Sequence, residues 1–77
     1  MRYKVIFFGI DGSMVAGVKA KLDGLRRVDL SFRYSIVEGY KGGYIVIVFE
    51  KEKDTAYKRA AWLWDKVFDR KCGYVVR

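Results

Sequence analysis

Two stretches of this sequence are apolar at consecutive positions rather than at every second one. Residues 5–10 read VIFFGI, and residues 44–49 read YIVIVF. Strands with apolar side chains on both faces tend to lie in the middle of a sheet that is covered on both sides. A chain of 77 residues can place helices over one face of such a sheet, but hardly over both. We therefore expect the second face to meet another molecule: a second copy, a nucleic acid, a ligand or a protein.

The rest of the sequence alternates between helix and strand patterns. Apolar residues recur at helical spacing over residues 14–25, where Gly24 is expected to end the helix, and residues 28–36 alternate between apolar and polar as in a half-buried strand. Three glycines in residues 38–43 predict a hairpin loop before the second apolar run. Asp54 is expected to cap a second helix that reaches about residue 70, and residues 73–77 are long enough for a last strand.

This order, β-α-β-β-α-β, predicts one domain over residues 1–77. Right-handed crossovers place both helices on one face of a four-stranded antiparallel sheet, with the first and third strands in the middle. The predicted fold is therefore an α+β, ferredoxin-like sandwich. Because this architecture hosts many unrelated functions, the function has to be argued from particular side chains.

The composition favours an anionic partner. Sixteen Lys and Arg residues face nine Asp and Glu, for a net charge of +7, which favours a nucleic acid or an acidic protein surface. The single cysteine, Cys72, excludes an internal disulfide framework and suits a reducing compartment, so we expect a cytoplasmic protein. No uncharged run approaches the ~20 residues of a membrane span, and we expect no membrane partner.

Residues suited to catalysis are scarce. The chain has no histidine, and a lone cysteine without histidine is a weak signal for a nucleophile. Zinc sites built from Cys and His are excluded by count, and the carboxylates alternate with lysines as on a solvated surface. At Gly12-Ser13 the sequence favours a tight strand-to-helix turn over a phosphate cradle. We therefore expect a binding module without enzymatic activity, catalytic residues, metal or cofactor.

Two segments resemble parts of the RNA-recognition motif. Residues 43–50 (GYIVIVFE) and 54–61 (DTAYKRAA) look like its third strand and second helix, and residues 5–10 are similar to its first-strand signature. The resemblance implies that bases stack on aromatic side chains of the outer sheet face.

Alternation from Tyr44 predicts which residues would form that outer face. It turns Tyr44, Val46 and Val48 outward, and Ile45, Ile47 and Phe49 toward the helices. Tyr44 fills one stacking position, Val46 fills a second where the family has an aromatic residue, and Phe7 or Phe8 supplies a third. We expect binding of RNA or single-stranded DNA by these residues, with Arg2, Arg33 and Lys41 contacting phosphates.

A second resemblance supports a different class of function. Residues 9–18 (GIDGSMVAGV) look like the Gly-x-Asp-x-Pro-Gly opening of ACT domains, which bind amino acids at dimer interfaces, although the proline and the glycine after it are absent. The alternative to nucleic-acid binding is therefore a protein-interaction or regulatory domain. It could be a homodimer through the sheet face, an ACT-like ligand sensor, or a small viral-type inhibitor of a host protein.

Trp62 is predicted to lie outside the core. At 100° per residue it points away from the stripe of Ala60, Trp64 and Val67, toward a charged side of the second predicted helix. An exposed tryptophan often marks a contact with a partner, and the other interpretation is a ring lying flat over lysine stems.

Overall fold

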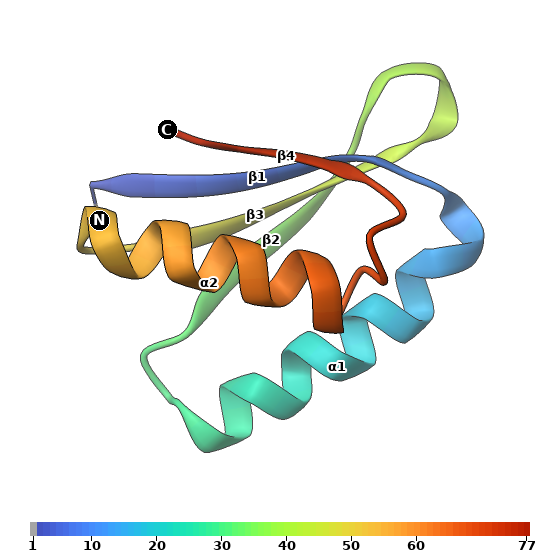
Figure 1. The fold of residues 1–77 in the computed structure, drawn as a ribbon. Helices are drawn as coiled ribbons and strands as arrows, with labels where there is room; N and C mark the ends of the chain where they lie inside the picture. The colour runs from blue at the N-terminus through green and yellow to red at the C-terminus, as the bar shows by residue number, and fades with distance from the viewer. Residues whose placement is uncertain (1) are drawn as a thin grey trace.

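The two apolar runs lie side by side at the centre of a sheet. In the computed structural model, which describes residues 2–77, β1 (Tyr3–Ile10) and β3 (Tyr44–Glu50) pair antiparallel. The shorter strands β2 (Arg33–Glu38) and β4 (Gly73–Val76) pair antiparallel on either side of them, which gives the order β2-β3-β1-β4 (Figure 1). The apolar pattern thus predicted the central strands correctly.

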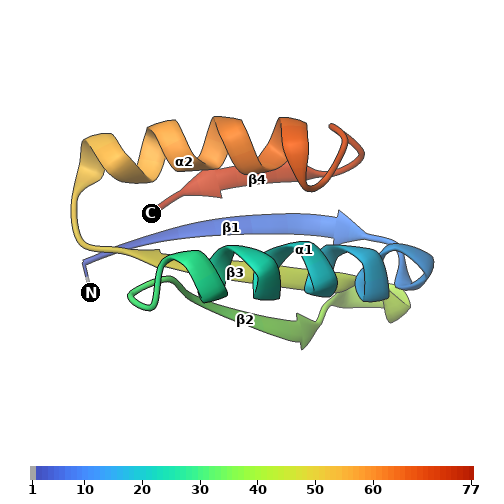
Figure 2. The same cartoon turned by 90° about the horizontal axis from the view of Figure 1, so that it is seen from below.

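Two helices form the second layer. α1 (Val15–Val28) follows β1 through the 3₁₀ turn η1 (Gly12–Met14), and α2 (Lys53–Lys66) follows β3. Both helices lie on the same side of the sheet, and the opposite side carries no helix (Figures 1 and 2). The predicted α+β class, with a four-stranded antiparallel sheet and two helices, is confirmed. No helix of residues 2–77 is both long and apolar enough to cross a bilayer.

The core fills the space between the sheet and the helices. Phe7 of β1 pairs with Val46 of β3, and the Phe7 ring stacks on the Phe68 ring with their centroids 4.3 Å apart. The buried apolar residues form one cluster drawn from both layers: Val5, Phe7, Ile10, Val18, Leu22, Phe32, Val46, Val48, Ala56, Ala60, Leu63, Val67 and Phe68.

The predicted orientation of β3 is wrong. Val46 and Val48 are 1 % and 0 % exposed on the helix side, whereas Ile45, Ile47 and Phe49 lie on the outer face. Because β3 is apolar at almost every position, alternation fixes two sets of residues but not which set is inside. The deciding contact is at the end of the strand, where Glu50 turns toward the helices and pairs with an arginine of α2.

The segment between α1 and β2 also differs from expectation. α1 continues through Gly24 to Val28, and Asp29 then accepts a hydrogen bond from the backbone N–H of Ser31 at 3.0 Å, which makes a turn. The predicted strand positions Val28 and Leu30 are therefore 89 % and 81 % exposed.

The boundaries of α2 differ as well. α2 begins after Glu52 rather than at Asp54, and it ends at Lys66, four residues before the expected position. Asp69 and Arg70, in the segment that follows α2, have positive φ angles of 53° and 58°. These angles do not belong to a right-handed helix, which explains the early end.

Candidate functional site

The outer face of the sheet combines apolar and basic side chains. Strand alternation and the observed pairing place eleven strand residues on this face: Lys4, Ile6, Phe8, Arg33, Ser35, Val37, Ile45, Ile47, Phe49, Gly73 and Val75. All except the glycine and the serine are apolar or basic, and no carboxylate lies among them. The strands therefore present no acidic side chain on this face.

Three cations flank an aromatic ring at one end of this face. Phe49 pairs with Arg33 of β2 on one side and with Lys4 of β1 on the other. Arg77 lies directly opposite Lys4, because the two residues exchange backbone hydrogen bonds of 2.6 and 2.7 Å. These four residues form the cationic row, which crosses the whole sheet, and Arg2 lies exposed just before it in the chain.

The cations of this row are available to an external anion. Within the part of the chain that the structure describes, Lys4, Arg33 and Arg77 form no ion pair, whereas other basic residues pair with carboxylates of the helical layer. A cluster of one sign without counter-charges concentrates the positive potential of the molecule at this place.

Phe8 provides a second aromatic ring on the same face. A bulge in β1 between Phe7 and Ile10, where Gly9 has φ of 73°, interrupts the pairing with β3 beside it. The ring lies over Gly73 of β4, where a Cβ atom would stand only 2.5 Å from the ring Cζ. With 44 % of its surface exposed, Phe8 offers an apolar ring to solvent.

A hollow of about 240 Å³ lies next to Phe8. Tyr40 of the turn η2 (Tyr40–Gly42) stands on its rim with 88 % of its surface exposed, and the Lys41 ammonium lies 5.6 Å from the centroid of that ring. Glycines line much of it, so a flat ring can approach the backbone. The full lining is Phe8, Gly9, Gly39, Tyr40, Gly43, Tyr44 and Ile45.

The structure separates the predicted binding residues. Arg33 is exposed on the outer face, Arg2 is exposed just before β1, and Lys41 is exposed in η2. Phe7, at 0 % exposure, and Val46 belong to the core, so neither can touch a partner there.

Tyr44 and Trp62 also lie away from the open sheet surface. Tyr44 packs partly against the core, 3.5 Å from where a Cβ on Gly12 would lie, and reaches only the edge of the hollow. Trp62 is 50 % exposed on the helical layer, as predicted.

Sequence reasoning missed Phe49, Lys4 and Arg77. A signal for the first two was present, because Arg2 and Lys4 are charged at alternate positions entering β1. Because charged side chains avoid the core, Lys4 must face outward, and alternation along the strand then turns Phe8 outward and Phe7 inward. Phe49 pairs with Lys4, so it faces outward as well. Arg77 could be placed only from the observed pairing of the chain end.

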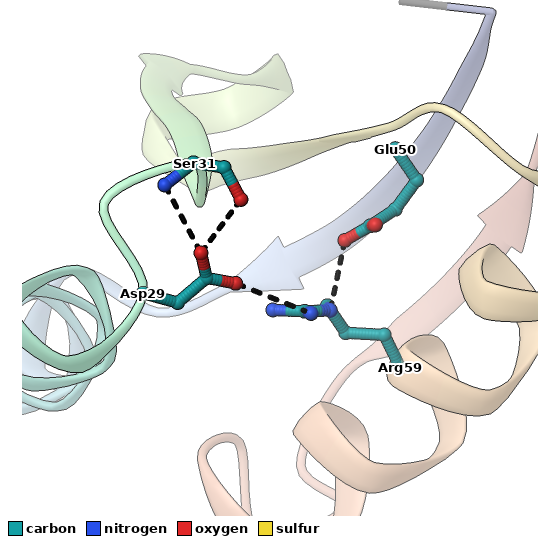
Figure 3. A network of polar contacts seen from close by, with 4 residues as sticks. All are labelled: Asp29, Ser31, Glu50 and Arg59. Carbon is teal, nitrogen blue, oxygen red and sulfur yellow. Dashed lines mark hydrogen bonds and ion pairs between the residues drawn. The ribbon is translucent and has the colours of Figure 1, made fainter.

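A polar network fixes the end of β3 beside the cationic row (Figure 3). Arg59 holds two carboxylates: its Nε atom lies 2.8 Å from Glu50 Oε2, and a terminal nitrogen lies 3.7 Å from an Asp29 carboxylate oxygen. The Arg59 guanidinium also lies 5.2 Å from the centroid of the Phe32 ring. Burial raises the pKa of Glu50, and hydrogen bonds from Ser31 hold the pKa of Asp29 below its ordinary value. This network joins the turn after α1, the end of β3 and α2.

Cys72 is poorly suited to nucleophilic chemistry. Burial raises the pKa of its thiol to about 11, which keeps it protonated at neutral pH. Its carbonyl accepts a hydrogen bond of 2.6 Å from the Trp64 indole N–H, which indicates a structural role. Over residues 2–77, no group of three or more Cys, Asp or Glu side chains is placed to hold a metal ion.

Comparisons with protein-family models, with curated proteins and with solved structures found no match to this chain. Its function is therefore inferred from its own surface.

Proposed function

We propose that this chain is a non-enzymatic module that binds single-stranded RNA or DNA through the outer face of its sheet. The observation that carries the proposal is the cationic row, in which Arg33, Lys4 and Arg77 flank Phe49 on a face without carboxylates. Phosphates are attracted to such clustered cations, and every base can stack on an exposed aromatic ring.

The spacing of the two aromatic rings suits an extended strand. Phe49 lies beside Lys4 and Phe8 lies four residues further along β1, which is on the order of 13 Å along the sheet. The two rings would therefore receive different bases. The apolar residues Ile6, Ile47 and Val75 lie between them and would contact the intervening sugars and base edges.

We further propose that the scaffold is the ferredoxin-like fold. Support comes from the strand order β2-β3-β1-β4, from the central position of β1 and β3, and from the two helices on one face. In that arrangement the face opposite the helices is free to bind a strand of nucleic acid.

The test is fluorescence anisotropy with labelled single-stranded RNA and DNA 12-mers at low salt. Phe49→Ala and Phe8→Ala should each weaken binding by ~1–3 kcal/mol, the range for loss of one base-aromatic stack. Tyr57→Ala is the control, because Tyr57 is an exposed aromatic residue on α2, away from the sheet face. Absence of binding by the parent, or an equal loss in the Tyr57 variant, contradicts the proposal.

The alternative is a homodimer through the same face, favoured by the apolar strip of Ile6, Ile47 and Val75. Sedimentation velocity distinguishes the two functions. A dimer that forms without nucleic acid and dissociates in Ile47→Asp would assign the face to a second copy. A protein that stays monomeric at all concentrations would exclude the homodimer and favour nucleic-acid binding by the outer face.

A further inference from the structure

A second exposed apolar surface lies on the opposite layer, in a groove between α1 and α2. The groove encloses about 380 Å³ and is lined by Leu25 of α1 and by residues of α2. Leu63 is fully buried beneath it, and Trp62 stands at its side with half of its surface exposed. The residues of α2 that line it are Thr55, Lys58, Arg59, Trp62 and Leu63.

The apolar surface extends beyond the groove itself. Val28 follows Leu25 by one helical turn on the same side of α1, and it is 89 % exposed. An exposed tryptophan beside a groove with an apolar lining is typical of an interaction site, because leaving large apolar side chains in water is unfavourable.

The charges around the groove select the partner. No carboxylate lies among its lining residues, and Lys58 and Arg59 both line it. Arg59 is already held by Glu50 and Asp29, so Lys58 is the cation directed at a partner. Lys21, one turn before Leu25, is also exposed.

We propose that this groove binds an acidic amphipathic helix of a partner protein. The apolar row of that helix packs on Trp62 and Leu25, and its carboxylates face Lys58 and Lys21. α1 and α2 have 14 residues each, about 21 Å, which matches a partner helix of three to four turns. A second copy fits less well, since a symmetric contact sets the same lysines against each other.

The test uses a fluorescein-labelled 14-residue synthetic peptide with leucines along one helical side and glutamates elsewhere. A scrambled peptide of the same composition is its control. The parent should bind the amphipathic peptide about tenfold or more tightly than the scrambled one, since only the ordered sequence presents apolar and acidic sides together. Trp62→Ala and Lys58→Glu should each weaken binding about tenfold or more.

Two variants test the location. Tyr57→Ala should leave peptide binding unchanged, because Tyr57 lies five residues from Trp62 and thus about 140° round α2. Phe49→Ala, on the outer sheet face, should also leave it unchanged. Circular dichroism and urea melts verify that Trp62→Ala remains folded. Lys58→Glu changes an exposed side chain, so it tests peptide binding in the groove even if Trp62→Ala is unstable.

Four outcomes overturn the proposal. They are no peptide binding by the parent, equal binding of the scrambled peptide, a self-association that Trp62→Ala abolishes, and a loss of oligonucleotide binding in Trp62→Ala. The third outcome assigns the groove to a second copy, and the fourth assigns it to nucleic acid.

Discussion

Val46 and Ile47 are adjacent in the chain but lie on opposite faces of β3. Val46 is buried under the helices, whereas Ile47 lies on the outer face. Val46→Asp places a carboxylate in the core without a partner, and it should destabilise the fold by more than ~3 kcal/mol. Ile47→Asp should cost much less, since its carboxylate remains hydrated. Urea melts followed by circular dichroism measure both, and equal stability of the two variants would contradict the assigned orientation.

Tyr34 makes stability depend on alkaline pH. Its hydroxyl donates a hydrogen bond to Asp23, and burial, with this bond, raises the pKa of Tyr34 from 10.0 to about 12. Because the folded state favours the protonated phenol, its contribution is complete below pH 10 and is lost as the pH rises to about 12.

The check is the difference in unfolding free energy between the parent and Tyr34→Phe, measured by urea melts across this range. The difference should be constant below pH 10 and shrink between pH 10 and 12, as the parent loses the contribution that the variant lacks. Tyr57→Phe, which alters an exposed ring, should follow the parent at every pH. A difference between the parent and Tyr34→Phe that is independent of pH would mean that the phenol titrates normally.

At the scale of elements, α1 is weakened by an internal glycine. Gly24 lies well inside the helix, and a Cβ there would meet no atom within 4 Å. Gly24→Ala should therefore raise the free energy of unfolding by about 0.5–1 kcal/mol, through the lower entropy of the unfolded chain. Gly9→Ala is the contrasting control, because φ of 73° strains any other residue there. Destabilisation by Gly24→Ala would show that α1 is not regular at this position.

The sequence predicts which elements form better than how they are turned. The apolar runs identified β1 and β3 as central strands because strands that are apolar on both faces tend to lie in the middle of a sheet. The same property conceals which face is inside, and here the ion pair of Glu50 with Arg59 decides it. At the end of α1, Gly24 suggested a stop, yet the helix continues to Val28 and leaves an apolar side chain in solvent.

The candidate site was predictable only in part. Arg33 lies on the outer face as expected, because a charged residue at a strand position avoids the core whatever the orientation, and Arg2 is exposed just before β1. The predicted positions Tyr44 and Val46 failed with the orientation of β3, whereas Phe8, one of the two residues expected from the first strand, does lie on the outer face. Phe49 takes the place of Tyr44 as the aromatic residue that β3 presents on the outer face, and it pairs with Arg33 and Lys4.

At the scale of the whole molecule, basic residues occupy both layers, but their roles differ. The affinity for a single strand should fall with salt at a logarithmic slope of about −0.7 for each phosphate neutralised. Arg33→Gln and Lys4→Gln should each reduce the magnitude of that slope by about 0.7, because each removes one cation from the cationic row. Anisotropy titrations between 50 and 200 mM salt, roughly the range over which such slopes are read, measure the change.

Lys58→Gln is the matched control for this slope. Lys58 lies on the helical layer, away from the cationic row, and the slope should be unchanged. An equal reduction in the Lys58 variant would mean that nucleic acid is attracted by net charge without a defined site.

The contact between Phe8 and Gly73 also restricts how this sequence can diverge. A Cβ at position 73 would stand 2.5 Å from the Phe8 ring Cζ, so any side chain there would require the half-exposed ring to turn away from β4. A lineage that replaced the glycine would therefore have to move or lose the ring, and a lineage that kept the ring in place would keep a residue without a side chain. Covariation between positions 8 and 73 would then record whether the ring has been held over β4 in this position.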